Sequence, residues 1–174
     1  MPAALTQGRL PESEAIMPTV ERLLGDKGAR VITIEPSATV LDAAKLMNEH
    51  RIGSLVVINR AATARSGKGG ASEQEVVVGM FTERDVLTRV VAAKQDPSAT
   101  RVGDVMTTPV LTCGSRTTLE ELRRVMREKR IRHMPVLNDE SALCGMVSIG
   151  DLNTAKEAVM EETIRMLEIY SYRP

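Results

Sequence analysis

The sequence predicts an α+β fold made of two β-α-β-β-α repeats related by a pseudo-two-fold axis. Three observations lead to this prediction. Two similar segments follow each other along the 174 residues, each combines short apolar strands with amphipathic helices, and each is too small to cover its own sheet. Because neither segment could bury its apolar face alone, we expect the two to pack against each other.

The repeat shows as a constant spacing between matching residues. Up to the second strand, matching residues lie 79 positions apart, as Met47 and Met126 do. From the third strand onward the spacing is 66, as for Gly79 and Gly145, so the first copy carries an insertion of 79 − 66 = 13 residues. The matching segments are 31–34 with 110–113, 39–47 with 118–126, 51–57 with 130–136, and 79–85 with 145–151.

Each copy begins with a β-branched strand and continues with a helix whose apolar residues recur at helical spacing. Both helices start with a capping-box pattern, Thr39 with Asp42 and Thr118 with Glu121, which satisfies free amides of the first turn. A second helix is expected to start near residue 83 in one copy and 149 in the other. The expected strands are 31–34, 54–58 and 76–81, then 110–113, 134–137 and 143–147.

The insertion falls on residues 61–74, which are rich in Ala, Gly, Ser and Lys and predict a mobile surface loop. Its Gly67-Lys68 pair lacks the spacing and the strand–loop–helix setting of a phosphate-binding loop. The predicted organisation is a flexible leader (1–18), repeat 1 (19–95), repeat 2 (96–160) and a C-terminal helix or tail (161–174).

The segment 152–170 predicts one long helix or two, with apolar residues recurring on one face. This face could pack on its own repeat. Because the helix extends beyond the repeat, we favour a contact between two copies of the chain.

Composition argues against several classes of function. Lys plus Arg and Asp plus Glu both number 23, and the aromatic residues are one Phe and two Tyr, so we expect no nucleic-acid partner. No apolar run is long enough to span a bilayer, so no membrane partner is expected. With only His50 and His133, and no GxSxG or HExxH motif, we expect neither a metal site nor an enzyme.

The blocks Arg51-Ile-Gly-Ser-Leu-Val-Val and Gly79-Met-Phe-Thr-Glu-Arg-Asp, with their counterparts at 130–136 and 145–151, resemble the CBS domain. The match covers roughly residues 19–160. The chain therefore resembles the stand-alone CBS-pair proteins of bacteria and plant organelles. The resemblance implies a disc with two clefts that bind adenosine ligands: AMP, ADP, ATP, S-adenosylmethionine or an NAD-type compound. It also implies a homodimer and a regulatory ligand rather than a catalytic cofactor.

Asp85 and Asp151 stand three residues after Thr82 and Ser148, where a strand meets a helix. This spacing is itself a capping signal, and an acid in the first turn is stabilised by the helix dipole. The resemblance implies that each Asp accepts hydrogen bonds from ribose hydroxyls, while the Thr or Ser lies near ribose or phosphate. The two roles are compatible.

The two clefts are predicted to differ. Arg132 and His133 supply positive charge for a phosphate in the cleft of Asp85, whereas Gly53 and Ser54 hold the matching positions for the other cleft. Arg84, whose counterpart is Gly150, adds to the difference. The resemblance gives for cleft 1 Thr33, Ile34, Ile52, Met80, Thr82, Arg84, Asp85, Arg130, Arg132 and His133, and for cleft 2 Arg51, Gly53, Ser54, Thr112, Cys113, Ile131, Met146, Ser148 and Asp151.

We therefore predict a regulatory module that senses an adenine nucleotide and transmits its occupancy to a partner protein. Two alternatives stay open: an interaction scaffold with vestigial clefts, and a thiol-linked regulator that uses Cys113 or Cys144. Buried, reduced thiols are the simpler interpretation of these cysteines. The expected compartment is the cytoplasm, with the mitochondrion or plastid as the alternative.

Overall fold

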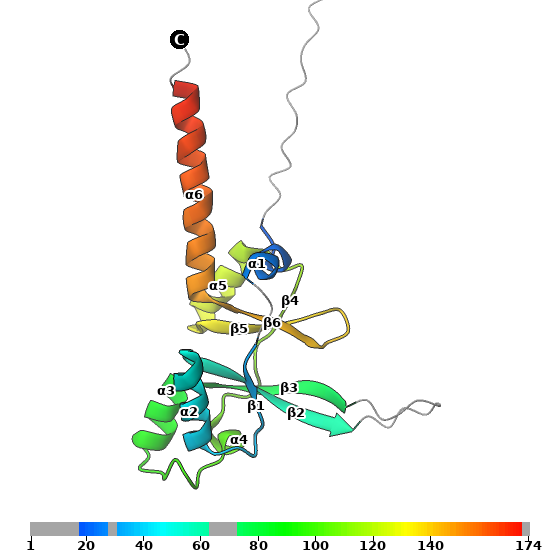
Figure 1. The fold of residues 1–174 in the computed structure, drawn as a ribbon, viewed down its shortest axis with the longest axis vertical. Coiled ribbons are helices and arrows are strands. Elements are labelled where there is room, and N and C mark those ends of the chain that lie inside the picture. The colour runs from blue at the N-terminus through cyan, green and yellow to red at the C-terminus, as the bar shows by residue number, and fades with distance from the viewer. Residues whose placement is uncertain (1–17, 28–30, 63–72, 172–174) are drawn as a thin grey trace, which may run out of the picture.

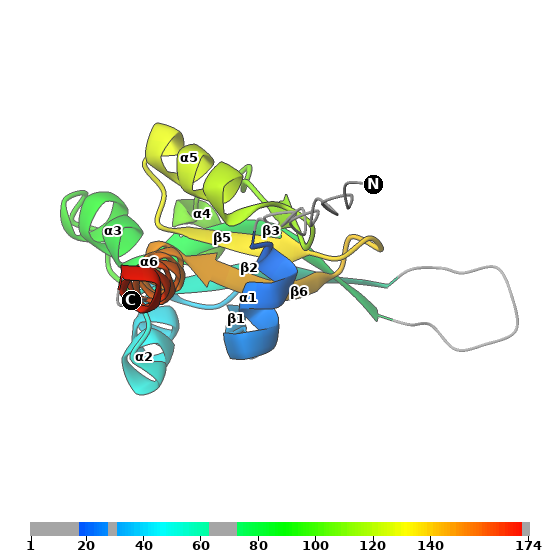
Figure 2. The same ribbon diagram turned by 90° about the horizontal axis from the view of Figure 1, so that it is seen from above.

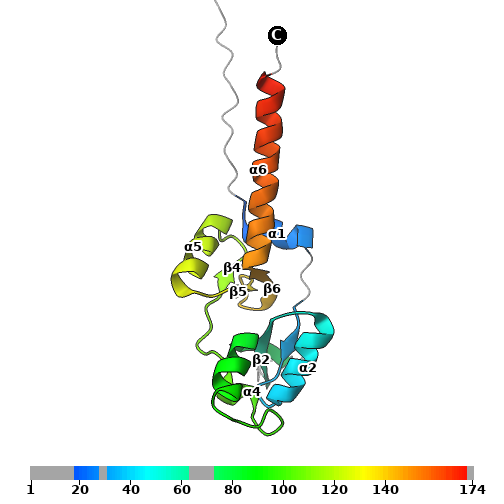
Figure 3. The same ribbon diagram turned by 90° about the vertical axis from the view of Figure 1, so that its left-hand side faces the viewer.

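The protein is described by a computed structural model that covers residues 18–27, 31–62 and 73–171. Two α+β halves are stacked on each other, each built on its own sheet (Figures 1 and 3). The elements are α1 (Val20–Lys27), β1 (Thr33–Ile34), α2 (Val40–His50), β2 (Ser54–Ala62), β3 (Glu73–Thr82), α3 (Glu83–Asp85), the π-helical segment η1 (Val86–Val91), α4 (Val102–Val105), β4 (Cys113–Gly114), α5 (Leu119–Lys129), β5 (His133–Leu137), β6 (Leu143–Ser148) and α6 (Ile149–Ser171).

The two sheets have the same topology, which confirms the predicted repeat. Each has three strands, in the orders β1-β2-β3 and β4-β5-β6, with a parallel pair followed by an antiparallel pair. The first strand of each copy is shorter than predicted. Only residues 33–34 and 113–114 pair with their neighbours, because the residues before them approach the other half of the molecule.

The predicted helix starts are confirmed by their caps. The hydroxyl of Thr39 accepts from the amide of Asp42 at 3.1 Å, and the hydroxyl of Thr118 accepts from the amide of Glu121 at 3.2 Å. The hydroxyl of Thr39 also donates to the Asp42 carboxylate at 2.6 Å, which lowers the pKa of that carboxyl. Both helices end at an arginine with a left-handed backbone, Arg51 and Arg130.

The short helices that precede each repeat pack on the other repeat. Val20 and Leu24 of α1 belong to the core of repeat 2, and Val102 and Val105 of α4 belong to the core of repeat 1. Accordingly, α1 lies beside β6 and α4 beside β3 (Figure 1). The sequence placed α1 in repeat 1 by its position along the chain, whereas its packing joins it to repeat 2.

Two matching glycines leave room for this exchange. A Cβ on Gly145 would lie 2.5 Å from Leu24 Cδ1, and a Cβ on Gly79 would lie 2.4 Å from Met106 Sδ. Both distances are shorter than ordinary contacts, so a side chain at either glycine would force Leu24 or Met106 to move.

The sheets meet through an apolar cluster in which Val56, Ile58 and Met80 are buried and Val110 and Met146 pack against them. Seen from above, α2, α3 and α6 lie toward one end of the molecule, and the β2–β3 hairpin projects from the other (Figure 2). The predicted loop 61–74 is shorter than expected, because residues 61–62 and 73–74 are strand. Its remainder, 63–72, and the predicted leader up to residue 17 lie outside the described residues.

The C-terminal segment is one continuous helix rather than two. Leu152 is its only fully buried residue, and the helix projects well beyond the two sheets (Figures 1 and 3). Among the described residues, no helix combines the length and the apolar character needed to cross a bilayer.

Candidate functional site

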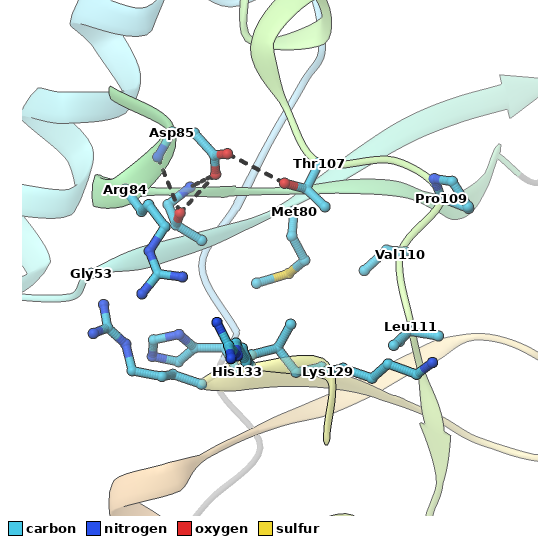
Figure 4. A pocket seen from close by; sticks show the side chains of 14 residues that line it. Gly53, Met80, Arg84, Asp85, Thr107, Pro109, Val110, Leu111, Lys129 and His133 are labelled. Carbon is cyan, nitrogen blue, oxygen red and sulfur yellow. Dashed lines mark hydrogen bonds between the residues drawn. The ribbon is translucent and has the colours of Figure 1, made fainter. Parts of the chain in front are cut away.

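A cavity of about 320 Å³ lies between the two repeats (Figure 4), within the size range of small-molecule sites. One side is formed by the end of β3, the start of α3 and the segment that follows α4. The start of β5 and the end of α5 form the other side. Its lining residues are Gly53, Met80, Thr82, Arg84, Asp85, Thr107, Pro109, Val110, Leu111, Lys129, Arg130, Ile131, Arg132 and His133.

Asp85 is the carboxylate of this cavity, and it is only 5% exposed. Its Oδ2 accepts from the Thr82 amide at 2.9 Å and from the Thr82 hydroxyl at 2.7 Å, which completes a capping box at the start of α3. Its Oδ1 accepts from the Thr107 hydroxyl at 3.2 Å. Both carboxylate oxygens therefore have partners, and Thr107 brings one of them from the segment that leads to repeat 2.

Arg89 ties the same carboxylate to that segment. Its Nε lies 3.5 Å from Asp85 Oδ1, and its Nη1 donates to the carbonyl oxygens of Val105 and Met106. The backbones of Met80 and Thr107 also exchange hydrogen bonds of 3.0 and 2.8 Å. The side chains of Thr107 and Arg89 thus connect Asp85 to the segment around the end of α4, and the backbone of Met80 holds the same segment.

The opposite side of the cavity is cationic. Lys129, Arg130 and Arg132 come from α5 and the turn into β5, and Arg84 faces them from α3. Arg84 and His133 reach toward the cavity from opposite sides (Figure 4). Three basic side chains opposite the buried carboxylate, with Arg84 on its own side, suit a ligand with an anionic end and a hydroxyl-bearing end.

The remaining wall is apolar, and the sequence missed most of it. Met80 was predicted, whereas Pro109, Val110 and Leu111 were not, because repeat spacing does not show that this segment crosses to the other repeat. Thr107 and Lys129 were also missed. Ile131 lines this cavity although it was predicted for the other cleft.

Three residues predicted for cleft 1 are not among the lining residues. Ile34 and Ile52 pack against the core of repeat 1, and Thr33 pairs with Val56 inside the sheet. The crossing segment 107–111 occupies the side of the cavity that had been assigned to them.

Some of the residues predicted for cleft 2 belong to the cavity of Asp85 instead. Gly53 and Ile131 line the cavity of Asp85, and Ser54 is buried in β2 with its hydroxyl 3.9 Å from the sulfur of Met146. Arg51 caps α2, and exposed Thr112 precedes β4. Ser148 and Asp151 repeat the capping geometry, since Asp151 Oδ2 accepts from the Ser148 amide and hydroxyl, both at 2.7 Å.

The two cysteines flank β5 from either side. Cys113 lies in β4 and Cys144 in β6, and each thiol is directed at a β5 carbonyl, Pro135 or Val136. Burial, with smaller contributions from Cys144 and Glu121, raises the pKa of Cys113 to about 11, and burial also raises the pKa of Cys144. Within the described ranges, no group of three His, Cys, Asp or Glu side chains could hold a metal ion.

Comparison with known proteins agrees with this architecture. The profile of the CBS domain matches residues 28–92 and 102–157. The CBS domain-containing protein CBSX3, mitochondrial, of Arabidopsis thaliana is 31% identical over 168 residues, which cover 93% of this chain and 76% of that protein.

Solved structures show the same relationship. The chain resembles a CBS-domain containing protein from Agrobacterium tumefaciens (TM-score 0.66, 33% identity, covering 79% of this chain and 98% of that one). It also resembles the hexameric CBS-CP12 protein from bloom-forming cyanobacteria (TM-score 0.58, 32% identity, covering 71% and 64%). Two matched repeats and these stand-alone relatives establish that this chain belongs to the CBS-domain family.

Proposed function

We propose that the chain is a non-catalytic regulatory module that binds an adenine nucleotide in the cavity of Asp85. The observation that carries the proposal is a buried carboxylate with Arg84 beside it and three more basic side chains across an apolar cavity between the repeats. Candidate ligands are AMP, ADP, ATP, S-adenosylmethionine and NAD-type compounds. The presence of the ligand in the cavity would be transmitted to a partner protein.

Each part of such a ligand has a matching surface. Asp85 would accept hydrogen bonds from the ribose hydroxyls. The phosphate would lie among Arg84, Arg132 and His133. A planar guanidinium can donate two parallel hydrogen bonds to a phosphate. The adenine ring would lie against the apolar wall that includes Val110 and Leu111.

The bonds of Asp85 suggest how occupancy would be transmitted. A ribose hydroxyl that donates to Oδ1 would compete with the hydroxyl of Thr107, which holds that oxygen at 3.2 Å. Release of Thr107 would loosen the segment between α4 and β4, which Arg89 and Met80 also hold. The ligand would then act through its differential affinity for the two arrangements of this segment.

The direct test is a thermal-shift and calorimetric screen of the full chain with the five candidate ligands. At a free ligand concentration about 100-fold above Kd, binding should add about 2.7 kcal/mol to the free energy of unfolding. Arg132→Ala should weaken phosphate-bearing ligands, whereas Arg116→Ala, which removes an exposed arginine paired with Asp139, should leave affinity unchanged. Equal affinity of Arg132→Ala and wild type would refute the assignment.

The Thr107→Val variant tests whether Thr107 competes with the ligand for Asp85 or contacts the ligand itself. It removes the hydroxyl that donates to Asp85, a bond with a net strength of about 1 kcal/mol, so we expect roughly fivefold tighter nucleotide binding. Weaker binding would identify Thr107 as a ligand contact instead.

No stabilisation by any ligand would favour the scaffold alternative, in which the disc itself is the docking surface. The thiol alternative has less support. With β5 between them, Cys113 and Cys144 lie two strand spacings apart, about 10 Å, beyond the reach of a disulfide without movement of the backbone.

We also propose a homo-oligomer, in keeping with the hexameric CBS-CP12 relative. We propose that the site of Ser148 and Asp151 binds phosphate more weakly than the site of Asp85, prefers a less charged adenosine ligand, or stays empty. The cytoplasm remains the proposed compartment. The mitochondrial relative supports the alternative location, and import assays with a fluorescent fusion would distinguish the two.

A further inference from the structure

The end of α6 is an amphipathic helix on which no other described element of the chain packs. Every residue from Lys156 to Ser171 is exposed. The large apolar side chains among them are 52–68% open to solvent. A free helix of about 15 residues is marginally stable in water, so this segment needs a partner on its apolar face.

Apart from Ile169, the exposed apolar side chains form one broad face. At about 100° per residue, the face spans about 160° of the helix and runs for about 17 Å, and no charged residue of 157–171 falls within it. Val159, Thr163, Met166 and Tyr170 follow the 4-3-4 spacing of a helix that packs lengthwise on another helix. Met160, Ile164 and Leu167 form the adjacent row.

The polar face decides between partners. It carries Glu157, Glu161, Glu162 and Glu168 against a single Arg165. Helices that lie on anionic membranes carry Lys and Arg on this face, so the acidic face disfavours such a membrane. A second helix of the same kind would cover the apolar face and leave the acidic faces in water.

The available area also fits a helix pair. Six apolar side chains of this face, each more than half exposed, offer on the order of 600 Å² per copy, against about 800 Å² per partner in a standard interface. From this area, spacing and charge we infer that residues 157–171 of α6 pair with the same residues of a second copy of this chain. The contact lies away from the cavity and does not depend on the nucleotide.

A cysteine cross-link tests the contact directly. In a Cys113→Ser/Cys144→Ser background, Thr163→Cys stands in the middle of the apolar face, where two paired helices bring it close to its own copy in either orientation. Under mild copper-phenanthroline oxidation we expect a disulfide-linked dimer. Arg165→Cys, at nearly the same height on the polar face, is the matched control and should remain largely monomeric in a denaturing gel.

A measurement on the chain with its native cysteines guards against misfolding of that background. Met160→Glu/Leu167→Glu should raise the dissociation constant for self-association, measured by sedimentation, by at least about tenfold, because it places charges in an apolar contact. Glu161→Gln/Arg165→Gln should not change it.

Two sets of results would overturn the inference. One is absence of the Thr163→Cys cross-link, or an equal yield at Arg165→Cys. The other is self-association unaffected by the glutamates, or sedimentation of the wild-type chain with phosphatidylcholine vesicles that the glutamates abolish.

Discussion

Replacing Gly145 by alanine tests how α1 is held on repeat 2. The new Cβ would lie 2.5 Å from Leu24 Cδ1 and 2.8 Å from Cδ2, so the leucine must move. Overpacking of this kind costs about 1–3 kcal/mol. Alanine in a strand recovers about 0.5–1 kcal/mol relative to glycine, so the net loss should be about 0–2.5 kcal/mol.

The contribution of the clash can be isolated with Leu24→Ala, which removes the atoms that the Cβ would meet. Alone, this substitution should cost about 2–5 kcal/mol, because Leu24 is part of the core of repeat 2. In the Leu24→Ala background, Gly145→Ala should become stabilising by about 0.5–1 kcal/mol. The two substitutions should therefore be coupled by about 1–3 kcal/mol.

Equilibrium urea unfolding of the four chains measures the coupling. Gly114→Ala is a suitable control, since a Cβ at Gly114 meets no atom within 4 Å. If the effects of Gly145→Ala and Leu24→Ala add to within about 0.5 kcal/mol, α1 does not rest on this glycine and the exchange of helices between repeats is misdescribed.

Three further predictions concern stability and titration. Phe81→Ala should destabilise the chain by about 3–5 kcal/mol in urea unfolding, because Phe81 is fully buried in the core of repeat 1; a loss below about 1 kcal/mol would contradict that packing. Asp42→Asn should flatten the pH dependence of stability at acidic pH. The lowered folded pKa of Asp42 means that its contribution is present above the unfolded value and is lost as pH falls through the folded value, and an unchanged profile would argue against the Thr39 bond. Cys113, with a pKa of about 11, should react slowly with iodoacetamide at pH 8 and faster as pH approaches 11, as followed by peptide mass spectrometry; rapid alkylation at pH 8 would show an exposed thiolate.

The sequence was most informative where the determinants are local. The N-caps of Thr39 and Thr118 depend on residues three positions apart, and the shared spacing reveals two copies of one unit. The pairs Thr82–Asp85 and Ser148–Asp151 were found for the same reason.

What could not be predicted is which repeat receives each connecting segment. Repeat spacing shows that two segments are alike, but α1 and residues 107–111 pack on the copy to which they do not belong in sequence. For this reason Thr33 and Ile34 were assigned to a cavity whose wall is Val110 and Leu111. A usable signal existed in Gly79 and Gly145, because a glycine inside a strand at the same place in both copies indicates a close approach of another segment.

The exchange of connecting helices imposes an order on the synthesis of the chain. Gly79 and Met106, which meet in repeat 1, are 27 positions apart, so this half can close while translation continues. Leu24 and Gly145 are 121 positions apart, so α1 emerges from the ribosome long before its binding surface exists. Helix α1 must wait for β6, and its packing is complete only when that long loop closes.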